Sequence, residues 1–132
     1  MADGISIEPV VHARWAASAA LIALVPASRF VTGDIQDELT AIPYVSFNLD
    51  QRQKLTSNSG RMDDATLFFE VTADSYATGN AIAKQIVETF SGTFETDGVT
   101  LTCLKPSIPQ REQSGLDRWI INLTIDAVAQ CL

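Results

Sequence analysis

The residues from Ala65 to Phe90 constrain the fold more than any other part of the chain, because two different structural patterns follow each other almost directly. Apolar and polar residues alternate over 65–73, which predicts a strand. Asp74 or Ser75 can then cap a helix whose apolar stripe comprises Ile82, Ala83, Ile86, Val87 and Phe90. Because only three residues separate the patterns, this helix must fold back onto the sheet that contains the strand.

The remaining residues predict one more helix and three more strands. The helical pattern runs from Val10 to Val25 and is stopped by Pro26. Strands are expected at 43–50, 99–104 and 116–128, and residues 26–42 and 92–98 are expected to be connections. The order α-β-β-α-β-β predicts an α+β fold, in which a four-stranded antiparallel sheet carries two main helices on one face.

The length of 132 residues suits a single domain spanning residues 1–132. Two segments are expected to depart from the compact core. One is a flexible N-terminal arm, residues 1–9, and the other is a long polar hairpin tract, residues 51–64, which joins the strands at 43–50 and 65–73.

The charge of the chain excludes some classes of partner. With a net charge of −7 and a pI of about 4.4, we expect no direct sequence-specific nucleic-acid binding and no binding to an anionic membrane, since both need basic residues. The most apolar run, Ala16–Val25, is too short to span a bilayer. The first residues lack the pattern of a secretion signal, so Cys103 and Cys131 are expected to be reduced thiols.

The predicted sheet has one apolar face for the core and a second face with an unusual composition. A solvated sheet face normally carries lysines and other charges, but the second face of the four predicted strands has no Lys or Arg. Either it is a threonine-rich face that tolerates water, or it packs on another subunit. The candidate interface residues are Tyr44, Phe68, Thr72, Leu104, Ile120 and Asn122.

No catalytic, cofactor-binding or metal site can be assigned from the sequence, and the chain is not expected to be an enzyme. The single histidine, His12, lies on the first helix without a supporting triad. Acidic residues at 34, 37 and 38 and at 63 and 64 are typical of solvated surfaces. A small set of basic residues either keeps two loops soluble or docks onto an acidic protein partner: Arg52, Lys54, Arg61, Lys105 and Arg111.

Three stretches of the chain resemble a known family. They are the proline-led strand Ala41–Phe47 with the polar tract after it, the strand Leu67–Ala73 running into the capped helix at Asp74–Tyr76, and the apolar register of that helix before the long last strand. Over residues 10–128 the chain resembles the tail-completion, or tail-terminator, proteins of long-tailed bacteriophages and prophages, including lambda-like minor tail proteins.

The resemblance implies a structural role in the virion. Such a protein forms a ring, typically a homo-hexamer, on the end of the tail tube, stops tube polymerisation and provides the surface that joins the head. The implied partners are other copies of the chain, the tail tube protein and a head–tail connector protein. The implied location is the tail end or neck of the virion, with the host cytoplasm during assembly. Two alternatives stay open: a connector protein of the same neck, and a small cytoplasmic ligand-binding α+β domain.

Overall fold

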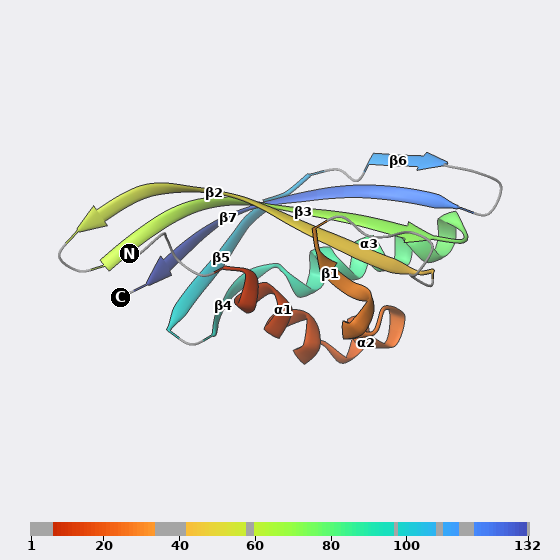
Figure 1. Ribbon diagram of the computed structural model, residues 1–132, viewed down its shortest axis with the longest axis horizontal. Coiled ribbons are helices and arrows are strands. Elements are labelled where there is room, and N and C mark those ends of the chain that lie inside the picture. Colours follow the sequence, from red (N-terminus) through yellow and green to blue (C-terminus); the bar gives the residue numbers. More distant parts are fainter. Residues whose placement is uncertain are drawn as a thin grey trace.

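A computed structural model describes residues 7–33, 42–57, 60–96, 98–107, 110–113 and 118–131 (Figure 1). The helices are α1 (Glu8–Ala17), α2 (Ala19–Leu24) and α3 (Tyr76–Thr89), with a short 3-10 turn η1 (Ala27–Arg29). The strands are β1 (Phe30–Thr32), β2 (Tyr44–Ser57), β3 (Gly60–Ala73), β4 (Gly92–Thr96), β5 (Val99–Pro106), β6 (Gln110–Gln113) and β7 (Trp119–Cys131).

These strands form one mixed, curled sheet, and the three helices lie together on one side of it (Figure 1). Six strands follow the order β1-β2-β3-β7-β5-β4, and β6 pairs with β7 beside that path. The pair β1–β2 is parallel, whereas all other pairs are antiparallel. The prediction of a four-stranded antiparallel sheet with two main helices, in the order α-β-β-α-β-β, was therefore wrong.

The missed strands are short and carry little alternation. β1 has three residues within the predicted connection 26–42, and β4 has five residues within the predicted connection 92–98. β1 is shorter than two strand periods, and β4 alternates only between exposed and partly exposed residues, so neither gives a clear alternation signal. The formation of β1 and β4 therefore depends on tertiary pairing with β2 and β5 and not on local sequence.

β5 and β6 lie along the same edge of β7, as one interrupted strand. β5 pairs with β7 from Val99↔Cys131 to Pro106↔Ile125, and β6 resumes at Gln110↔Asn122. Ser107 bridges the interruption, since its N–H donates to Thr124 O (2.8 Å) and its Oγ accepts from Thr124 N (3.0 Å). Residues 105–106 and 110–113, which lie outside the predicted strands, are thus part of the sheet.

The polar tract 51–64 continues the two strands that it joins. β2 and β3 stay in register from Tyr44↔Thr72 to Ser57↔Gly60, with one irregularity between Gln53 and Leu55. Figure 1 shows this hairpin extending beyond the helices. At the N-terminus, residues 1–6 of the predicted arm lie outside the described residues, while Ile7 is buried and Glu8 begins α1.

The helical pattern 10–25 divides into α1 and α2 at Ser18. The backbone of Ser18 is extended, its Oγ accepts from Leu21 N (3.2 Å), and its N–H donates to Trp15 O (3.1 Å). Ser18 is thus both the C-cap of α1 and the N-cap of α2, so it satisfies one backbone group at each of the two helix ends where the chain turns. Ser75, one of the two predicted caps of the later helix, is confirmed: its Oγ accepts from Thr78 N (3.2 Å).

A continuous row of aromatic rings links the helices to the sheet. Trp15 of α1 stacks on Phe30 of β1 with ring centroids 4.0 Å apart, and contacts continue through Phe47, Phe69 and Phe90 to Phe94. The first five of these side chains are buried. Buried aromatic pairs add to the stabilisation from area alone, so this row joins α1, the strands β1, β2 and β3, and the end of α3 in one core.

Candidate subunit interface

We call the sheet face opposite the helices the outer face. It presents the alternate residues of β2, β3 and β7 that do not enter the core, and the cross-strand register brings them into rows. Three predicted interface residues are accessible there, since Phe68 and Asn122 are exposed and Ile120 is partly exposed. Leu104 of β5, at the register irregularity beside this face, keeps 62% of its surface exposed.

The other two predicted interface residues are enclosed by their own subunit. Tyr44 and Thr72 are cross-strand neighbours at one end of the sheet, and they are only 5% and 1% exposed. The expectation that they offer contact surface is therefore corrected. Alternation assigned their face properly, but burial at the end of a sheet depends on tertiary packing that alternation does not report.

An exposed aromatic ring lies on the outer face, with three carboxylates in the neighbouring rows. Phe68 is 40% exposed and stands between Asn48 and Thr124 in the cross-strand register. Glu70 is two residues along the same strand, while Asp50 and Asp126 flank Thr66 in the adjacent row. We call Phe68, Asp50, Glu70 and Asp126 the Phe68 patch. Its three carboxylates were not among the predicted site residues.

A shallow hollow of about 260 Å³ adjoins this patch. Its lining includes Arg52 and Asp64, which are opposite each other in the β2–β3 register, and the exposed Leu104. Thr66 Oγ1 donates to Asp126 Oδ1 across 3.4 Å. Arg52 lies in the part of β2 beyond the predicted strand 43–50. The outer face therefore carries a basic side chain, which the prediction of a face without Lys or Arg did not include.

The five predicted docking residues do not form one cluster. Arg61, Lys105 and Arg111 stand opposite Cys131, Asp126 and Ile121 of β7 respectively. At about 3.3 Å per residue, Arg61 and Arg111 are separated by roughly 33 Å along that strand. Lys54 and Arg61 both belong to the end of the β2–β3 hairpin. The basic residues are therefore spread along the sheet, with one pair at the hairpin end.

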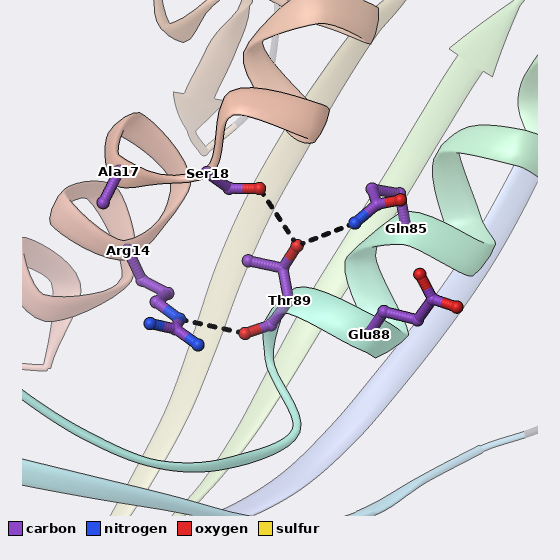
Figure 2. Close-up of a pocket in the computed structure, with 6 residues that line it drawn as sticks. All are labelled: Arg14, Ala17, Ser18, Gln85, Glu88 and Thr89. Carbon is purple, nitrogen blue, oxygen red and sulfur yellow. Dashed lines mark hydrogen bonds between the residues drawn. The ribbon is translucent and has the colours of Figure 1, made fainter.

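A second hollow, of about 250 Å³, lies on the helical side between α1 and α3 (Figure 2). Thr89 organises it: its carbonyl accepts from Arg14 Nε (3.0 Å), and its Oγ1 contacts Ser18 Oγ (3.2 Å) and Gln85 Nε2 (3.4 Å). The Arg14 guanidinium lies over the Phe94 ring, 4.7 Å from its centroid. These contacts join the ends of α1 and α3, a structural role that was not predicted from the sequence.

Cys103 is a poor nucleophile in this structure. It lines a crevice of about 50 Å³ with Val87, Phe90, Leu104 and Ile125. Burial raises the pKa of Cys103 to about 12, and the positive charge of Arg14 opposes that rise. The thiol therefore stays protonated at neutral pH.

Asp63, predicted as part of a solvated acidic pair, is fully buried and accepts from Gln51 Nε2 at 2.6 Å. Among the described residues, no three potential metal-ligating side chains gather at one point. Nor does the described part of the chain contain a helix of the length and apolarity that crossing a membrane requires.

Comparisons with known proteins give a match in structure alone. No family model matches the sequence, and no curated protein matches it. Among solved structures, the fold is similar to a chain from the virion of a native gene transfer agent particle. The TM-score is 0.67 at 23% sequence identity, and the match covers 91% of each chain. At this identity the likeness shows a common fold.

Proposed function

We propose that this protein is a structural component of a phage-type virion. The observation that supports this most is the fold match to a chain of a gene transfer agent virion, which covers 91% of both chains. A match over almost the entire length relates the two folds as wholes. The resemblance in the sequence to phage tail proteins is an independent argument for the same class.

Within the virion, the proposed role is that of a tail terminator. The protein forms a ring on the end of the tail tube, most simply a hexamer, stops polymerisation of the tube and provides the surface that joins the head. Its partners are then its own copies, the tail tube protein and a connector protein. A ring subunit needs surfaces for its neighbours, and the outer face supplies accessible apolar side chains in Phe68 and Leu104.

The test is deletion of the gene from the phage or prophage genome that encodes it, with particles examined by negative-stain electron microscopy. We expect tail tubes of uncontrolled length and heads without tails, and expression of the wild-type gene in trans should restore normal virions. Tails of normal length that fail to join heads would replace the terminator role with the connector role. Normal virions from the deletion strain would refute a structural role and favour the ligand-binding alternative.

A further inference from the structure

We infer that the Phe68 patch of one subunit binds the basic tip of the β2–β3 hairpin of a neighbouring subunit. The basic tip is defined as residues 53–57 and 60–62 of this hairpin, which include Lys54 at the register irregularity and Arg61 opposite Thr56. This inference deepens the proposed ring and rests on it, because it names the two surfaces that meet between subunits.

The Phe68 patch has the composition of a receptor for a cationic side chain. The exposed face of an aromatic ring attracts an ammonium or guanidinium group, and adjacent carboxylates add charge-assisted hydrogen bonds. Asp50, Glu70 and Asp126 are all exposed, and Lys105 of β5 stands opposite only Asp126 in the strand register. The patch thus presents three negative charges around one apolar anchor.

The basic tip has the complementary composition. The chain contains 16 acidic and 9 basic residues, yet no acidic residue occurs between Gln51 and Met62. Lys54 and Arg61 lie in that interval, at the end of β2 and the start of β3. A positive projection on a protein with a net charge of −7 is attracted to the acidic surface of another copy.

The tip cannot reach the patch of its own subunit. Phe68 lies eight residues from Gly60 along β3, a distance of about 26 Å in an extended strand. β3 is paired with β2 and β7 over this whole span, so the strand cannot bend back. The contact must join two molecules, and because it joins two different surfaces it is head-to-tail, which generates a closed ring when the rotation between subunits closes.

The experiment uses two charge-reversal variants of the full chain, studied by native mass spectrometry and sedimentation velocity over a wide concentration range. The face variant is Asp50→Lys with Asp126→Lys, and the tip variant is Lys54→Glu with Arg61→Glu. We expect the wild type to form a closed oligomer and each variant alone to be monomeric. A mixture of the two should assemble into oligomers with alternating subunits, because every tip again meets a face of opposite charge.

The matched control is Glu8→Lys with Glu88→Lys, which changes the net charge as much as the face variant does, at exposed helical positions away from the outer face. It should assemble like the wild type, and circular dichroism should show the same fold for all variants. A ring that persists in both charge-reversal variants overturns this inference and leaves the proposed ring intact. A wild type that is monomeric at every concentration overturns it as well, and the deletion experiment then tests the virion role separately.

Discussion

The close approach of α3 to the sheet at Gly79 gives the prediction that the structure defines most sharply. A Cβ added at Gly79 would lie 2.8 Å from Ile121 Cδ1 and 3.5 Å from Ala73 Cβ. Ile121 is only 1% exposed, so its methyl group has no solvent to move into. Gly79→Ala gains about 1 kcal/mol of helix propensity but incurs an overpacking cost of about 1–3 kcal/mol. We expect a net loss of ~0–2 kcal/mol in the free energy of unfolding.

A double-mutant cycle separates these two effects. Ile121→Val removes Cδ1 and should cost about 0.5–1.5 kcal/mol in the wild-type background. In the Gly79→Ala background the same change relieves the clash, so it should cost nothing or stabilise, with a coupling of ~1 kcal/mol or more. Urea unfolding of the four proteins measures this. Ala81→Gly, at an exposed position of α3, calibrates helix propensity alone. Additive losses at Gly79 and Ile121 would refute the reasoning.

Three further predictions concern individual side chains. Trp15→Phe keeps a ring against Phe30 but leaves the Val25 carbonyl, which accepts from Trp15 Nε1 at 3.0 Å, without that donor; urea unfolding should show a loss of about 1–3 kcal/mol. Ser75→Ala removes the N-cap of α3 and should cost about 1 kcal/mol, whereas Asp74→Ala, at an exposed neighbour that does not cap, should cost far less. Because the folded pKa of Cys103 is raised to about 12 from 9.0, the unfolded thiol ionises first; stability should fall as pH rises from about 9 to 12, and fall less steeply in Cys103→Ala. At neutral pH, peptide mapping after timed iodoacetamide labelling should show slow alkylation of Cys103 compared with the unfolded protein.

The long periodic elements were predictable from the sequence, and the short ones were not. The alternation in 65–73 and the stripe through Ile82 and Ile86 correctly placed β3 and α3, since each spans several periods. Phe30 shows why β1 was missed. It is a buried aromatic residue in a three-residue strand, and the residues beside it in the sequence do not distinguish it from a hydrophobic residue in a loop.

Part of the outer face was also predictable. The alternation placed Phe68 and Asn122 on it, and both are exposed. The gathering of Asp50, Glu70 and Asp126 around Phe68 depends on the register between three strands, and a register is a tertiary property. Contacts between segments far apart in the chain likewise produce the burial of Tyr44 and Thr72 and the hydrogen bond from Arg14 to the Thr89 carbonyl.

The pairing of β3 with β7 has a mechanical consequence. Thirteen consecutive residue pairs join these strands, from Arg61↔Cys131 to Ala73↔Trp119, and their hydrogen bonds run perpendicular to the strand axes. A pull that draws β3 and β7 past each other along those axes loads the whole ladder in shear, so its bonds must yield together instead of one after another. Tension applied through the hairpin is thereby resisted by the two longest ladders of the sheet, which lie on either side of β3.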